Sequence, residues 1–161
     1  MTWITDSAER QRQETERETT IASYVLENRE KLQHQIVPTW ERIFDAIDRD
    51  VRELNAHGKQ LVVERGPTMI QVRTDNEISA QFVLEIDFTQ GRLHCTWPVP
   101  PGKIGVPRSV EFQMRIGVGE ATIMMLRGPN GTVVRFAPER VSQFLLLPTL
   151  SPNATPHMKC A

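Results

Sequence analysis

The chain has 161 residues, of which 39% are hydrophobic and 24% are charged, and its formal net charge is −1. These values are typical of about one soluble globular domain with a core of its own. A charge this close to zero gives no bulk attraction to nucleic acid or to an anionic membrane surface. No apolar run reaches the roughly 18 residues of a membrane span, and the N-terminus lacks the features of a secretory signal. We therefore expect a cytoplasmic protein without a membrane partner.

The sequence before Gly58 predicts an arm and two helices. Residues 1–15 are polar and rich in Glu, Arg and Gln, which predicts a polar N-terminal arm. Over residues 16–37, apolar residues recur every three or four positions and predict a helix with one apolar face: Ile21, Val25, Leu32 and Ile36. Pro38 ends or kinks this helix, because its ring blocks the preceding turn and it has no N–H to donate. A second stripe, from Trp40 to Leu54, predicts a helix over residues 38–57 that covers the sheet.

Residues 60–136 have the pattern of an antiparallel sheet of about seven strands with one face covered. In Glu77–Phe88 and Ser109–Ile116, apolar residues alternate with mostly polar ones, so successive side chains point to opposite faces. Turn residues between the strands predict a meander. The turns set the expected cross-strand pairs: Leu61 with Val72, Val63 with Ile70, Ile70 with Ala80, Val72 with Ile78, Ile86 with Cys95, Asp87 with His94, Phe112 with Ile123, Met114 with Ala121, and Arg115 with Glu120.

The last part of the chain predicts one short helix and a tail. Pro138 begins a helix over residues 138–147, Pro148 closes it, and residues 149–161 form a flexible tail. Residues 98–107 form the longest irregular connection, because the prolines at its start lack a donor for a strand ladder. The expected fold is a single α+β domain over residues 16–148, with two N-terminal helices, a meander sheet and a short C-terminal helix.

The sequence contains few groups suited to chemistry. No spacing of ligands suits a metal, and Gly117-Val-Gly119 lies between strands rather than before a helix, so we expect neither a metal nor a cofactor. Cys95 is predicted on the buried face, which indicates a small core residue. The remaining catalytic candidates are Asp87 and His94, since a carboxylate beside an imidazole orients it and raises its pKa. On a solvent-exposed sheet face, such a pair is also a common surface interaction that contributes little to stability.

Most bases after Gly58 are arginines on predicted strands or at their ends: Arg65, Arg73, Arg92, Arg115, Arg127 and Arg135. This part of the chain has 11 Lys+Arg and 8 Asp+Glu, a net +3, whereas the first 58 residues have 8 and 12, a net −4. Complementary halves of one fold explain this asymmetry. Trp97 and Phe88 are predicted to point inward, so no exposed aromatic platform accompanies the arginines, and we do not expect nucleic-acid binding.

Our first hypothesis is a non-enzymatic interaction module that binds a protein partner or a second copy of itself. This function is favoured by the long charged helix, the polar sheet face and the lack of a group of side chains suited to catalysis. Self-association would use the apolar stripe of the first helix, with Ile21, Val25 and Leu32 at the contact. Packing of the same stripe within the chain is the alternative, because packing is the usual source of helix stability.

Two further hypotheses stay open. The protein could bind a small apolar ligand in a pocket between helix 38–57 and the sheet, lined by Trp97, Phe112, Met114 and Met125. Methionine and aromatic residues at these positions are also what an ordinary core contains. The third hypothesis is an enzyme that uses Asp87 and His94.

Overall fold

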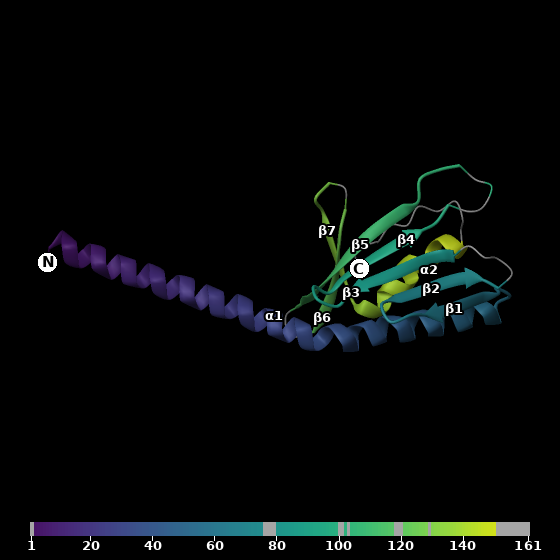
Figure 1. Cartoon of the computed structure of the whole chain (residues 1–161), viewed down its shortest axis with the longest axis horizontal. Helices are drawn as coiled ribbons and strands as arrows, with labels where there is room; N and C mark the ends of the chain where they lie inside the picture. Colours follow the sequence, from purple (N-terminus) through teal and green to yellow (C-terminus); the bar gives the residue numbers. More distant parts are fainter. Residues whose placement is uncertain are drawn as a thin grey trace.

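The structure is a computed structural model that describes residues 2–75, 80–99, 102, 104–117, 121–128 and 130–150, without the side chains of residues 24, 25, 149 and 150. It has the α+β architecture that the sequence predicts: a long N-terminal helix, a seven-stranded antiparallel sheet and a short C-terminal helix (Figure 1). The first half of the long helix projects away from the rest of the molecule, and its second half lies along the sheet (Figure 1).

The prediction of two helices separated at Pro38 is wrong. A single helix, α1, runs from Trp3 to Ala56 with Pro38 inside it. An internal proline costs about 3 kcal/mol, whereas burying one large apolar side chain contributes about 1.5–3 kcal/mol. Five such side chains of α1 are buried against the sheet and α2, which outweighs the proline: Ile36, Trp40, Ile43, Ile47 and Val51. Because Pro38 has no N–H, the carbonyl of His34, four residues earlier, lacks its helical hydrogen bond. Both residues are exposed, so water can solvate that carbonyl.

The seven strands follow one another in the sheet in chain order, each antiparallel to its neighbours. Their bounds are β1 Leu61–Arg65, β2 Met69–Thr74, β3 Ala80–Asp87, β4 Arg92–Trp97, β5 Arg108–Ile116, β6 Thr122–Arg127 and β7 Val133–Phe136. Alternate residues of β2 to β6 are buried on one face, as the period-two pattern predicts. The other face carries the polar and charged residues and is not covered by any described element.

Two helices share the covered face of the sheet. The second half of α1 and the C-terminal helix α2, Val141–Leu150, contribute to the same core as the inward residues of the strands. A short 3-10 helix, η2, spans Pro138–Arg140 and leads into α2, where we predicted one helix over 138–147. Pro148 lies within α2 rather than ending it, and residues 151–161 of the predicted flexible tail lie outside the described part of the chain.

Polar contacts at the edges hold α1 to the elements beside it. Arg42 of α1 donates from Nε to the Glu139 carboxylate at 2.6 Å, which ties α1 to η2. Glu41 of α1 pairs with Arg65 of β1, whose guanidinium also lies 4.5 Å from the centre of the Phe44 ring. The hydrogen bonds from Arg65 lower the pKa of Glu41 from its ordinary value. These pairs are partly exposed, so they orient the helix more than they stabilise it.

The register differs from the predicted one by an even number of residues at the first three hairpins. Val63 lies opposite Val72, Val72 opposite Phe82, and Leu84 opposite Cys95. The loops are longer than the tight turns we assumed, and β2 has a register shift between Val72 and Arg73. An even shift keeps every side chain on its predicted face, so the buried residues of β2 to β4 are those that the sequence indicates. Ile78 lies outside the described residues.

The register of β6 differs by an odd number, which exchanges its two faces. Met114 lies opposite Met124 rather than Ala121, and Phe112 lies opposite Leu126 rather than Ile123. The hairpin closes through the Gly117 N–H and the Ala121 carbonyl, 2.7 Å apart, which leaves three residues in the loop rather than two. One additional residue turns each side chain of β6 to the opposite face, so Thr122 and Met124 are buried. Arg115 lies opposite Ile123, and its predicted partner Glu120 lies outside the described residues.

The contact of α1 with the sheet predicts a large difference between two isoleucines. We expect Ile43→Ala to lower the free energy of unfolding by about 2–5 kcal/mol, because Ile43 is fully buried at the centre of this contact. Ile104→Ala is the control, since Ile104 is fully exposed, and we expect it to change stability by less than about 0.5 kcal/mol. Urea denaturation followed by circular dichroism measures both. Equal effects of the two substitutions on the free energy of unfolding would contradict the burial of Ile43 between α1 and the sheet.

Candidate functional site

Asp87 and His94, the catalytic candidates, are not cross-strand partners. Asp87 lies opposite Arg92, whereas His94 lies between Glu85 of β3 and Glu111 of β5. The predicted pairing is wrong because the β3–β4 hairpin closes at Asp87 and Arg92, with four residues in its loop. The Asp87 carboxylate accepts a hydrogen bond from the Thr89 N–H at 2.8 Å, so it orders this loop. His94 is exposed on the open face between two exposed carboxylates.

The residues of the predicted apolar pocket divide between two faces of the sheet. Phe112 and Met114 are fully buried, and the Phe112 ring packs edge-on against the Phe136 and Phe144 rings with centroids 5.8 and 5.6 Å apart. Trp97 packs on Phe144, and its Nε1 donates to the Leu145 carbonyl at 3.3 Å. Met125 is half-buried on the open face, because of the odd shift of β6. These four side chains therefore do not line one common pocket.

The residues of the apolar stripe that we predicted to mediate self-association have different surroundings. Leu32 is half-buried against the core and Ile36 is fully buried, so packing within the chain accounts for this end of the stripe. Ile21 is 64% exposed, in the part of α1 that projects from the domain. The side chain of Val25 lies outside the described part of the chain. The stripe is therefore a core element at one end and an exposed surface at the other.

A cavity of about 750 Å³ lies where α1 reaches the sheet. Its walls come from four segments: Asn28 to Gln33 of α1, the β3–β4 loop, the start of β4 and the end of β5. Arg29, Arg92 and Arg115 line it together, and Leu32 and Ile116 supply its apolar part. No carboxylate is among the described residues that line it. We call this cavity the arginine cavity.

Hydrogen bonds fix the walls of the arginine cavity. Gln33 of α1 donates from Nε2 to the Thr89 carbonyl at 2.5 Å, which joins the helix to the β3–β4 loop. Gln113 of β5 donates to the Gln90 carbonyl at 2.8 Å, and its Oε1 accepts a hydrogen bond from Arg92 Nε at 3.1 Å. Arg92 is thus held by a side chain that is itself held by the loop. Its two terminal NH₂ groups have no hydrogen-bond partner among the described residues.

The glycine at the end of this loop brings the walls close together. Gly91 has a φ of +67°, which side chains other than glycine rarely adopt. A Cβ atom there would lie 3.3 Å from the Cβ of Met114 and 3.4 Å from Ile36 of α1. The Gly91 carbonyl accepts the Met114 N–H at 2.9 Å, so the loop is bonded to β5 directly beneath the cavity.

The arginines of the cavity have no salt bridge within the described residues, and the same holds for Arg108, Arg127, Arg135 and Arg140. Five other arginines each form an ion pair: Arg42, Arg49, Arg52, Arg65 and Arg73. Within the described ranges, no salt bridge joins Arg29, Arg92 or Arg115 to an acidic residue. A second concavity of about 670 Å³ adjoins the first on the open face and shares Arg92, Gln113 and Arg115 with it. It adds Arg127 and also Glu111, so its lining has charges of both signs.

Sequence reasoning named Arg92 and Arg115 as strand arginines but did not bring them together with Arg29. The net +3 of the later part of the chain is the one signal that pointed to a basic surface. The cavity depends on the contact between α1 and the β3–β4 loop, which joins residues more than fifty positions apart. Local patterns carry no information on that contact.

Neither a metal site nor a membrane span is found in the part of the chain that the structure describes. No three His, Cys, Asp or Glu side chains there are arranged to hold a metal ion. No helix there is both long enough and apolar enough to cross a bilayer. A scan of protein-family models and searches of curated proteins and of solved structures found no match to this chain. Function is therefore inferred from the geometry.

The buried thiol of Cys95 gives a prediction about reactivity. Burial raises the pKa of the Cys95 thiol well above its ordinary value, so it stays protonated at neutral and mildly alkaline pH. In a Cys160→Ser background, we expect no reaction with Ellman's reagent at pH 8 in the native state and one reactive thiol after unfolding in guanidinium. A rapid native reaction would contradict the burial of Cys95.

Proposed function

We propose that this protein is a non-enzymatic interaction module that associates with a second copy of itself through the projecting half of α1. The observation that supports this function is the exposure of residues 3–27, which we call the free arm. Every side chain that the structure describes in the free arm is exposed, and the helix there stands clear of the domain (Figure 1). At 1.5 Å per residue the free arm is roughly 37 Å long.

The free arm carries four large apolar side chains that are exposed, two of which, Trp3 and Ile21, lie on one side. Trp3, Ile4, Ile21 and Leu26 are 78%, 61%, 64% and 56% exposed. Trp3 and Ile21 are five helical turns apart, so they lie on the same side of the helix. Ile21 and Leu32 are about three turns apart, so this side continues into the face that the domain buries. The apolar stripe of α1 thus continues from the core as far as Ile21, and Trp3 lies on the same side at the far end of the free arm, beyond the polar residues 5–20. No described element of the same chain covers these side chains.

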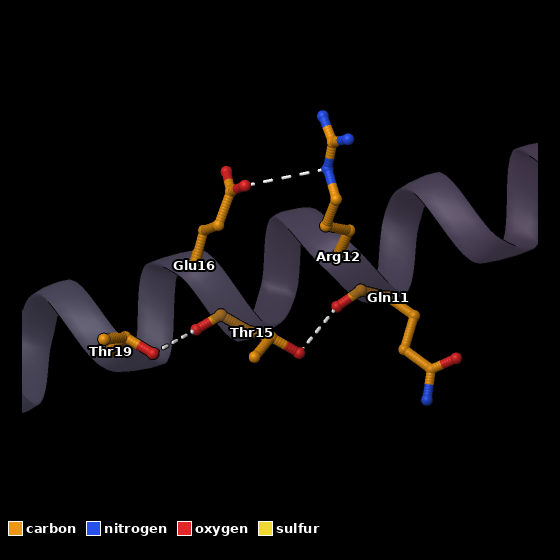
Figure 2. A network of polar contacts seen from close by, with 5 residues as sticks. All are labelled: Gln11, Arg12, Thr15, Glu16 and Thr19. Carbon is orange, nitrogen blue, oxygen red and sulfur yellow. Dashed lines mark hydrogen bonds and ion pairs between the residues drawn. The ribbon is translucent and has the colours of Figure 1, made fainter.

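Several polar side chains of the free arm bond within the arm itself. Thr15 and Thr19 donate from Oγ1 to the carbonyls of Gln11 and Thr15, each at 2.9 Å, and Arg12 Nε lies 3.6 Å from a Glu16 carboxylate oxygen (Figure 2). Such exposed pairs contribute only about 0.3–0.5 kcal/mol each, and threonine is a poor helix former. A partner that covers the apolar stripe supplies the packing that stabilises most protein helices.

Two copies can cover each other's stripe by packing their free arms together. Closed twofold symmetry is the commonest arrangement of protein oligomers, and it buries the same patch on both copies. Polar residues, among them Gln11 and Glu18, lie on the same side of the helix between Trp3 and Ile21, so we expect this association to be reversible. The hypothesis of an apolar-ligand pocket has no comparable support, because its residues are packed against one another or lie on the open face.

Removal of residues 1–27 tests the role of the free arm. This deletion keeps Asn28, Arg29 and all buried residues of α1, so we expect the shortened chain to fold with nearly the same melting temperature. We expect sedimentation equilibrium to show a dimer or larger assembly for the full chain and a monomer for the shortened one. A full chain that stays monomeric at about 100 μM, well above typical protein–protein dissociation constants, would overturn the proposed function.

Two neighbouring substitutions provide a matched comparison. Ile21→Glu places a charge in the apolar stripe, whereas Thr20→Glu places the same charge one position away, on the side of the helix that carries Glu9 and Glu27. We expect Ile21→Glu to weaken association at least about tenfold and Thr20→Glu to weaken it by less than about threefold, since losing a buried apolar side chain costs 1.4 kcal/mol or more. Equal effects would assign the association to net charge rather than to the stripe.

A further inference from the structure

We propose that the arginine cavity binds the phosphate groups of a small phosphorylated ligand, a function separate from self-association through the free arm. Three guanidinium groups from α1, β4 and β5 line one cavity, and no described carboxylate lines it with them. Like charges gathered in this way repel one another. An anion between them removes the repulsion, because it pairs with all three.

The chemistry of the three arginines favours phosphate over a single carboxylate. A guanidinium group presents a planar fork of N–H donors that matches either group through two parallel hydrogen bonds. One carboxylate has two oxygens and one negative charge, which a single arginine satisfies. A phosphate monoester or pyrophosphate carries more negative charge and three or more terminal oxygens, so it accepts from several arginines at once.

The hydrogen-bond network of the cavity prepares Arg92 for this role. Its Nε donates to Gln113, which leaves its two terminal NH₂ groups available to a ligand in the cavity that Arg92 lines. Gln113 is bonded in turn to the carbonyls of Gln90 and Met114, at 2.8 and 3.1 Å. Because this orientation exists before the ligand arrives, less side-chain entropy is lost on binding.

The rest of the cavity suits the non-phosphate part of a small molecule. Its volume of about 750 Å³ lies in the range of small-molecule sites, about 300–1,000 Å³. Leu32 and Ile116 offer an apolar surface, and Asn28 and Gln33 offer amide donors and acceptors. The adjoining concavity adds Arg127 but also Glu111, so we place the anionic groups of the ligand in the arginine cavity itself.

Isothermal titration calorimetry with inorganic pyrophosphate tests the proposal on the full chain. We expect a dissociation constant of about 1 mM or tighter at low ionic strength, since the three arginines are exposed and salt screens them. The Arg92→Gln and Arg115→Gln variants should each bind about tenfold more weakly. Arg49→Gln is the control, because it removes the same charge from an arginine that is paired with Asp50 and does not line the cavity.

Three outcomes would overturn the proposal. The first is no detectable binding of pyrophosphate at 10 mM, about ten times the expected dissociation constant. The second is equal weakening by Arg49→Gln and Arg92→Gln, which would show a response to net charge alone. The third is binding of citrate as tight as that of pyrophosphate at equal ionic strength, which would show a carboxylate site. Retained folding is checked from the melting temperature of each variant, and sedimentation shows separately whether the free arm still associates.

Discussion

The packing of the second half of α1 on the sheet is the contact on which the rest of the structure depends. Five buried side chains of this helix, from Ile36 to Val51, fill the apolar face of a meander that has no other long cover. Their burial exceeds the cost of Pro38, so the helix continues through the proline. The same contact sets the β3–β4 loop against α1 through Gln33 and Thr89. Without it, neither the arginine cavity nor the direction of the free arm would be defined.

The two proposed sites occupy adjacent parts of α1 and use different physics. The free arm offers an apolar stripe on a weakly stable helix, so its partner must supply packing. The arginine cavity offers fixed positive charge beside a small apolar surface, so its ligand must supply negative charge. Arg29 and Leu32 line the cavity only about one or two turns beyond Leu26, the last large exposed apolar residue of the arm. Each site can be removed by substitutions that leave the other in place.

The strands and the buried faces of β2 to β4 could be predicted from the sequence because alternation is a local signal. Val72, Leu84 and Cys95 are buried as expected although their partners differ, since errors of two or four residues in the register preserve the face. At β6 the error in the register is three residues, an odd number, which reversed the face and moved Met125 out of the predicted pocket. The continuity of α1 could not be predicted, because Pro38 is a strong local signal whose outcome is decided by packing elsewhere. The arginine cavity was missed for the same reason.

Hydrogen exchange along α1 at several protein concentrations tests the central claim most directly, because it separates the half of the helix that the sheet stabilises from the half that a partner stabilises. The amides of Ile43 to Val51 should be protected equally at every concentration. The amides of the free arm should exchange rapidly in dilute solution and gain at least about tenfold protection at concentrations where the protein associates. Free-arm protection that is the same at all concentrations would contradict the account, and so would rapid exchange around Ile43.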